Sequence, residues 1–140
     1  MVNSSREERL GGVKLVSQDN HICETTLTAL LGKRFADTPD APALTFGSET
    51  LTYGALDKRT GALAAALVAR GVGPDVTVAI CLPRSVEQVI ALLAVIRAGG
   101  AYVPLNPEDP EARRQGILDD CAPAVLLAEH VCGTTPLLPP

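Results

Sequence analysis

Three short apolar runs that alternate with helix-length segments constrain the fold of this chain more than any other feature. The runs are 75–82 (DVTVAICL), 101–105 (AYVPL) and 124–128. The first run lacks the polar alternation of a half-solvated strand, which indicates that both of its faces are covered. Strands separated by helical crossovers are typical of a parallel sheet with right-handed connections. The sequence therefore predicts an α/β fold.

Two amphipathic segments precede the first run. The segment 25–36 places apolar residues on one helical face, namely Leu27, Leu30, Leu31 and Phe35. The next helix carries its seam at Leu56, Thr60, Leu63 and Leu67, and it ends at Arg70-Gly71, a basic last turn followed by glycine. Between them, 43–46 and 50–53 are β-prone stretches separated by Gly47-Ser48-Glu49, which predicts an N-terminal β-hairpin.

Two further helices are predicted between the apolar runs. Ser85 begins the first of them, with Gln88 at capping-box spacing, and Gly99-Gly100 ends it. After the proline-rich turn 106–110, we expect Asp109 to cap a helix that has Pro110 in its first turn and runs to about Cys121.

The chain divides into three parts. Its 140 residues suit one small domain. Residues 1–24 show no sustained period and are rich in Ser, Gly, Asn and charge, so they are predicted to be a poorly ordered leader or linker. Residues 25–130 form the predicted folded part, and 131–140 form a C-terminal tail.

Composition argues against several classes of partner. Aromatic residues make up 3%, Trp is absent and the net charge is −4, so the stacking surfaces and basic clusters of nucleic-acid-binding proteins are missing. The longest apolar run, Val89 to Ile96, is eight residues, whereas a membrane span needs roughly 18 or more. Charged residues stand where a signal peptide needs an apolar stretch, which predicts a cytoplasmic protein.

The four cysteines, at 23, 81, 121 and 132, form no C-x-x-C pair or other zinc-ligand spacing. Their number leaves disulfides open. In a domain that is not exported, however, we expect reduced thiols that act as small buried hydrophobes.

Two stretches carry a resemblance to a known family. LTYGALDKRTGALAAALVARGVG (51–73) and AICLPRSVEQVIALLAVIRAGGAYVPLNPEDPEARR (79–114) resemble the first and second signature regions of amino-acid adenylation domains from nonribosomal peptide synthetases. The resemblance extends from about Thr26 to Ala128 and keeps the family's order and spacing. It implies part of the N-terminal subdomain of the acyl-adenylate-forming fold, a partial three-layer arrangement of a parallel sheet with flanking helices.

The resemblance also implies the chemistry of the parent enzyme. AMP-forming synthetases use ATP and Mg²⁺ to convert a carboxylate, here usually an amino acid, into an acyl-adenylate with release of pyrophosphate. The acyl group then passes to the phosphopantetheine thiol of a carrier protein. The family's phosphate loop, its ATP-binding aspartate, its substrate pocket and its mobile C-terminal lysine lie downstream of these signatures. We therefore expect no catalytic, cofactor-binding or metal-binding residue here, and no activity of this chain alone.

The sequence departs from the family pattern at two positions. Ala55 replaces a usual acidic residue, and a glutamate there would complete a capping box with Thr52. Asn106 replaces a usual aspartate, which keeps a turn-forming side chain and removes its charge.

The other candidate residues have simpler structural interpretations. Tyr53 and Tyr102 are expected to pack against helices, and Gly99-Gly100 to form a turn. The acidic pairs Glu108-Asp109 and Asp119-Asp120, and the basic pair Arg113-Arg114, fit caps and solvated helix faces. His21 and His130 have no acidic or thiol partner at ligand spacing. The loop Cys132–Pro136 has small residues but neither a second glycine nor a lysine to hold phosphate.

The resemblance leaves more than one role for the chain. In the leading interpretation, the chain is a truncated or separately encoded N-terminal piece of an adenylation domain, and its partner is the remainder of that domain. In the second, it is an accessory half-domain that pairs with a separate chain, which predicts an exposed apolar edge. A remnant without activity and an acyl-CoA synthetase-like fragment, which would share the fold, remain open.

Overall fold

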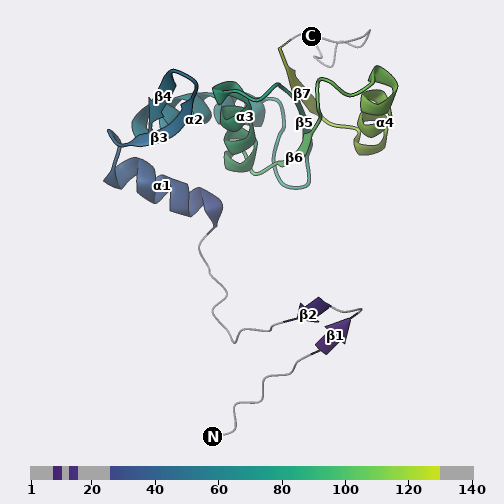
Figure 1. The fold of residues 1–140 in the computed structure, drawn as a ribbon, viewed down its shortest axis with the longest axis horizontal. Helices are drawn as coiled ribbons and strands as arrows, with labels where there is room; N and C mark the ends of the chain where they lie inside the picture. The colour runs from purple at the N-terminus through teal and green to yellow at the C-terminus, as the bar shows by residue number, and fades with distance from the viewer. Residues whose placement is uncertain (1–7, 11–12, 16–25, 130–140) are drawn as a thin grey trace, which may run out of the picture.

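The computed structural model describes residues 8–10, 13–15 and 26–129. Figure 1 shows the order of the elements along the chain. They are β1 (Glu8–Leu10), β2 (Val13–Leu15), α1 (Leu27–Asp37), β3 (Pro42–Phe46), β4 (Glu49–Thr52), α2 (Tyr53–Ala69), β5 (Thr77–Cys81), α3 (Val86–Arg97), β6 (Ala101–Pro104), α4 (Glu111–Cys121) and β7 (Val125–Ala128). The predicted hairpin is confirmed as the antiparallel pair β3–β4, although Tyr53 begins α2 and does not end the strand.

A short antiparallel ribbon, β1–β2, lies in the segment for which the sequence indicated no element. Glu8 is opposite Leu15 and Leu10 is opposite Val13. Each strand has three residues, too few for hydrophobic alternation to be recognised in the sequence.

A three-stranded parallel sheet of order β6-β5-β7 forms the centre of the fold. In β5, Val78, Ala79 and Ile80 are at most 1% exposed, which confirms that both faces of this strand are covered. Side chains of α2 and α3 pack with Val78 and Ile80, while α4 lies beside Cys81, Leu126 and Ala128, which belong to the opposite face. The predicted partial three-layer α/β architecture is therefore confirmed.

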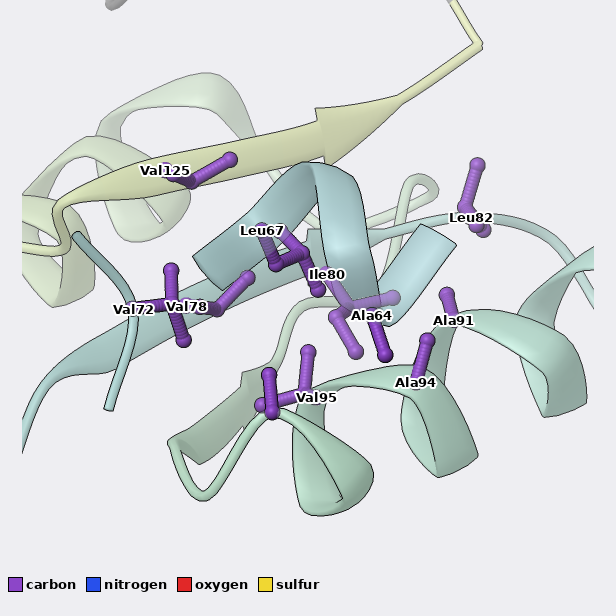
Figure 2. Close-up of a cluster of buried hydrophobic side chains, with 11 residues drawn as sticks. Ala64, Leu67, Val72, Val78, Ile80, Leu82, Ala91, Ala94, Val95 and Val125 are labelled. Atoms are coloured by element: carbon purple, nitrogen blue, oxygen red, sulfur yellow. The ribbon is translucent and has the colours of Figure 1, made fainter. Parts of the chain in front are cut away.

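The main core lies between the sheet and the helices α2 and α3. Figure 2 shows its side chains converging from β5, β7 and the two helices. The buried members are Ala64, Leu67, Val72, Val78, Ile80, Leu82, Ala91, Ala94, Val95, Ala98 and Val125. Most of them are alanine or valine, so α2 and α3 can approach each other and the sheet closely.

A second core cluster joins α1 and the β3–β4 hairpin to α2 and α3. Its buried residues are Phe35, Leu56, Val86 and Ile90. The sequence placed Leu27 and Leu30 on one helical face with Leu31 and Phe35, but only part of this face is covered, because Leu27 and Leu30 are 51% and 50% exposed. In α1 the residues that enter this cluster are Phe35 and the half-buried Leu31, which lie nearer the C-terminal end of the helix.

The start of α3 follows the prediction in part. Ser85 Oγ accepts a hydrogen bond from the backbone N–H of Gln88 at 3.2 Å, as expected of an N-cap. The Gln88 side chain does not complete the box, because its Nε2 donates instead to the Leu82 carbonyl at 3.1 Å. The amide thus ties the helix to the end of β5.

The prediction that Asp109 caps α4 is wrong. Pro110 occupies the N-cap position and makes no side-chain capping bond. Asp109 lies one residue too early, and its carboxylate forms an ion pair with Arg113 at 3.5 Å.

The turn between α3 and β6 confirms the structural interpretation of the glycine pair. Gly99 has a φ of 82°, in the left-handed region that favours glycine. A Cβ on Gly100 would lie 2.7 Å from Val72 Cγ1 and 3.1 Å from the Val76 carbonyl oxygen. Gly99 is therefore explained by its backbone conformation, and Gly100 by the close approach of Val72 and Val76.

Candidate functional site

A hollow in the described part of the chain lies where β5 and β6 end. It has a volume of about 740 Å³ and is formed by the loops after these strands together with the start of α4. In open α/β sheets, ligands bind at this carboxyl end of the strands. Its lining residues include Arg84, Gln88, Asn106, Glu108, Asp109 and Arg113.

The polar groups of this hollow largely hold its own loops together. Asn106 Oδ1 accepts a hydrogen bond from the Glu108 backbone N–H at 3.1 Å, which confirms that this position keeps its turn-forming role. Nearby, Arg114 Nη1 donates to the Pro107 carbonyl at 2.6 Å. The lining contains two arginines, Arg84 and Arg113, and two carboxylates, Glu108 and Asp109, so its charges balance.

This balance does not fit the polyphosphate of ATP, because the two carboxylates would repel it. Within the described ranges, no group of three or more His, Cys, Asp or Glu side chains comes together as metal ligands would. We therefore assign no ATP contact and no reaction step to the residues that line this hollow.

A second, apolar groove lies against the edge of the sheet at β7. It is lined by the apolar residues Leu63, Leu82, Ile90, Ala91, Leu127 and Ala128 and by the charged residues Arg59 and Glu87, and its volume is about 300 Å³. We call these eight residues the β7 groove. No sequence pattern predicted it, because its walls come from α2, α3, β7 and the end of β5, which only folding brings together. Leu63, expected in a helix seam, is half-buried here.

The two charged residues of the β7 groove, Arg59 and Glu87, belong to a cluster of ion pairs. Arg59, on α2, pairs with Glu87 of α3 at 3.0 Å and with Glu49 of β4 at 3.4 Å. The pKa of the Glu87 carboxyl is lowered, first by a hydrogen bond from its own backbone N–H in the first turn of α3 and then by the Arg59 guanidinium. The cluster thus links three elements at the surface.

The two tyrosines have different environments. Tyr53 packs as predicted, with its ring centroid 6.3 Å from that of Phe35. The prediction for Tyr102 is wrong, because this residue is 44% exposed. Tyr102 lies on β6, which is an edge strand of the sheet, whereas Tyr53 begins a helix that packs into the second cluster.

The charged pairs behave as helix and turn residues. Asp119 accepts a hydrogen bond from Gln115 Nε2 at 2.7 Å within α4, and Asp120 is exposed. Arg113 is exposed as expected, whereas the half-buried Arg114 holds the proline turn.

The cysteines and histidines give only a partial test. Cys81 and Cys121 are thiols and not half-cystines, as predicted. The sequence also predicted that they would be buried, whereas each is half-buried. Cys23, His21, His130 and the loop Cys132–Pro136 lie outside the described residues. Among the helices that the structure describes, none is long and apolar enough to cross a membrane.

The comparisons with known proteins agree with one another. The family described as AMP-binding enzyme matches residues 31–139. Tyrocidine synthase 3 of Brevibacillus parabrevis is 44% identical over 110 residues, which cover 79% of this chain and 2% of that protein. Bacitracin synthase 1 of Bacillus licheniformis is 41% identical over 105 residues, which cover 75% of this chain and again 2% of the relative.

Solved structures show the same relationship. The Klebsiella oxytoca NpsA N-terminal subdomain superposes with a TM-score of 0.70 at 28% identity, covering 78% of this chain and 29% of that one. An artificially fused NpsA-ThdA adenylation–PCP di-domain also gives a TM-score of 0.70, at 30% identity, with 74% and 20% coverage. The chain thus spans a small part of each relative.

Proposed function

This chain belongs to the AMP-binding enzyme family, as part of a nonribosomal peptide synthetase adenylation domain, and from that premise we propose that it forms the first α/β layer of an amino-acid-activating enzyme. The complete enzyme would convert ATP and an amino acid into aminoacyl-AMP and pyrophosphate. It would then transfer the aminoacyl group to the phosphopantetheine thiol of a carrier protein.

The observation that carries this proposal is the superposition on the NpsA N-terminal subdomain over most of the described fold. The family likeness is not confined to one motif, because it runs from α1 through β7. The fused adenylation–PCP relative supports a carrier protein as the partner of the complete enzyme.

We propose further that these residues act as scaffold and do not react. Adenylate formation requires ATP, carboxylate and Mg²⁺ to be aligned while the developing charge is compensated. The balanced charges of the large hollow offer no such compensation. The ATP, Mg²⁺ and amino-acid contacts would come from the rest of the domain, in the cytoplasm, where ATP is available.

ATP–pyrophosphate exchange over a panel of amino acids tests this function. We expect no exchange by the 140-residue chain, and amino-acid-dependent exchange once the part of an adenylation domain that follows the matched segment is supplied, either mixed or covalently joined. Exchange by the chain alone would contradict the scaffold role. If the two parts form a complex but show no exchange with any amino acid, the adenylation function is wrong.

The alternative of an accessory half-domain that pairs with a separate chain is favoured by one observation. One edge strand of the sheet is β7, of which Leu126, Leu127 and Ala128 are half-buried, and the β7 groove lies beside it. The same experiment distinguishes the two roles. A half-domain made for a separate partner should exchange as fast when the parts are mixed as when they are joined. A piece of one continuous enzyme should be markedly slower when mixed at the same concentration.

A further inference from the structure

Two charged side chains in the hollow at the ends of β5 and β6 have no partner in the fold. Arg84 lies in the loop after β5, and Glu108 lies in the proline-rich turn after β6. Within the described ranges, neither side chain makes an ion pair or a hydrogen bond. Asp109 and Arg113, by contrast, pair with each other at 3.5 Å. The hollow therefore presents one unpaired cation and one unpaired anion.

Asn106 adds a neutral donor to the same hollow. Its Oδ1 accepts the hydrogen bond from the Glu108 backbone N–H at 3.1 Å, which orients the side-chain amide. In the part of the chain that the structure describes, its Nδ2 donates to no acceptor. An amide nitrogen carries two donor hydrogens. Asn106 can therefore supplement Arg84 as a donor to an anionic group.

Apolar side chains line the hollow together with these polar groups. Leu82 and Leu105 are 8% and 5% exposed, and the half-buried Ile117 of α4 lines the same space. A concave apolar lining with a few polar groups is typical of sites for small molecules. The hollow thus offers packing surface as well as charge.

The charges of the lining define the class of ligand. The two carboxylates repel a polyanion, and the two arginines repel a polycation. A molecule with one carboxylate and one ammonium group meets the opposite charge at each end, at Arg84 and at Glu108. Amino acids with an apolar side chain and short peptides with free termini have this chemistry. The volume of about 740 Å³ admits either of them.

The charge balance depends on Asn106, one of the positions at which the sequence departs from the family pattern. An aspartate there would give the lining three carboxylates against two arginines. The added carboxylate would also compete with a ligand carboxylate for Arg84. The balance is therefore a feature of this chain and not of the family pattern.

We propose that the hollow at the ends of β5 and β6 binds a small apolar zwitterion, either a free amino acid or a short peptide. Arg84 and Asn106 hold its carboxylate, and Glu108 holds its ammonium group. The apolar part of the ligand packs on Leu82 and Leu105. The proposal concerns binding alone, so it goes beyond the proposed function and does not depend on ATP–pyrophosphate exchange.

Titration of the 140-residue chain followed by NMR tests the site. Leucine is compared with isocaproate, which lacks the ammonium group, and with leucinamide, which lacks the carboxylate. We expect leucine to shift the amides of Arg84, Asn106 and Glu108 saturably. Each analogue should bind at least about 3-fold more weakly, because it loses one charge pair at a site open to solvent. Isocaproate that binds as tightly as leucine would overturn the proposal.

Leucine and dileucine distinguish the two sources of the ligand chemistry. Both carry one ammonium group and one carboxylate, but the two charges are further apart in dileucine. Tighter binding of leucine assigns the site to a free amino acid, and tighter binding of dileucine assigns it to a short peptide. If neither shifts these amides saturably, the proposal is wrong.

Matched variants test the role of each charge. Arg84→Gln and Glu108→Gln should each weaken leucine binding at least about 3-fold. Arg84→Gln should not weaken leucinamide binding, since leucinamide has no carboxylate for Arg84 to hold. Arg59→Gln, the same change in the β7 groove, should leave leucine binding unchanged.

Asn106→Asp tests the dependence on charge balance. It keeps the oxygen that accepts from the Glu108 N–H and adds a carboxylate, so we expect it also to weaken leucine binding. Circular dichroism checks that every variant is folded, and if Arg84→Gln is not, Glu108→Gln and the ligand series decide. Equal affinity of folded Arg84→Gln and the unchanged chain for leucine would overturn the proposal.

Discussion

Arg97 is the side chain that ties α3 to α2. Its Nη1 donates to Asp57 Oδ1 at 2.7 Å, to Thr60 Oγ1 at 2.6 Å and to the Asp57 carbonyl at 3.1 Å. The guanidinium carbon lies 5.3 Å from the centroid of the Phe35 ring, which adds a cation–π contact. Thr60 is fully buried, so its hydroxyl depends on such partners.

Arg97→Lys should destabilise the chain by about 1–2 kcal/mol, because an ammonium cannot reproduce the planar guanidinium against both Asp57 and the ring. Urea unfolding followed by circular dichroism measures the change. Arg113→Lys is the matched control, since this exposed ion pair at 3.5 Å should contribute less than about 1 kcal/mol. Equal effects of the two substitutions would contradict the role of Arg97.

The ionisation of Glu87 makes the stability of the folded chain depend on pH. Its pKa in the folded chain lies below the ordinary value of 4.5, because its own backbone N–H and Arg59 favour the carboxylate. The resulting stabilisation is complete above about pH 4.5 and is lost as pH falls through the lower folded value.

Titration of the Glu87 carboxyl carbon by NMR should therefore give a midpoint below 4.5. Arg59→Met should raise this midpoint only part of the way, since the backbone hydrogen bond is the larger cause. Arg113→Met should leave it unchanged. A Glu87 midpoint at or above 4.5 in the unchanged chain would refute the assignment.

The start of α2 shows the effect of Ala55, one of the two positions at which the sequence departs from the family pattern. Thr52 Oγ1 accepts from the Ala55 N–H at 3.2 Å, so the N-cap is present, but Ala55 cannot return a bond to Thr52. Half of a capping box is therefore missing at this helix.

Ala55→Glu should stabilise the chain by roughly 0.5–1 kcal/mol, by completing the box and placing an acidic residue in the first turn. The gain should appear as a higher midpoint in urea unfolding. It should shrink when Thr52 is also replaced by alanine, since the reciprocal bond is then lost. If Ala55→Glu raises the stability equally with Thr52 and with alanine at position 52, the stabilisation comes from the helix dipole and not from the capping box.

Helices α3 and α4, which connect the parallel strands, differ in burial because of their composition. In α3, five residues are buried and the sequence VEQVIALLAVIR is mostly apolar. In α4, EARRQGILDDC, no residue is buried. The latter helix is held by terminal contacts, such as the bond from Thr77 Oγ1 to the Cys121 carbonyl, and packs only loosely on its face of the sheet.

Across the described fold, the three-stranded sheet has two edge strands, β6 and β7. Binding of the downstream polypeptide to the folded chain should raise its stability by about 2.7 kcal/mol when that polypeptide is present at about 100 times its Kd. Thermal unfolding at increasing concentrations measures this effect. A melting temperature independent of concentration would show that the added part does not bind the native fold.

The alternation of apolar runs and helical periods determined the α/β class, the hairpin and the order of elements from α1 to β7, because each depends on residues close together in the chain. The caps at Thr52 and Ser85 depend likewise on neighbours three positions away. Tertiary structure alone decided which apolar residues stay uncovered: Leu27, Leu30 and Tyr102 belong to regular elements whose exposure depends on what packs against them. It also decided the β7 groove, since the distance between Leu63 and Leu127 in sequence says nothing of their proximity in space. Local periodicity specifies elements, whereas burial at an edge depends on the order in which strands pair.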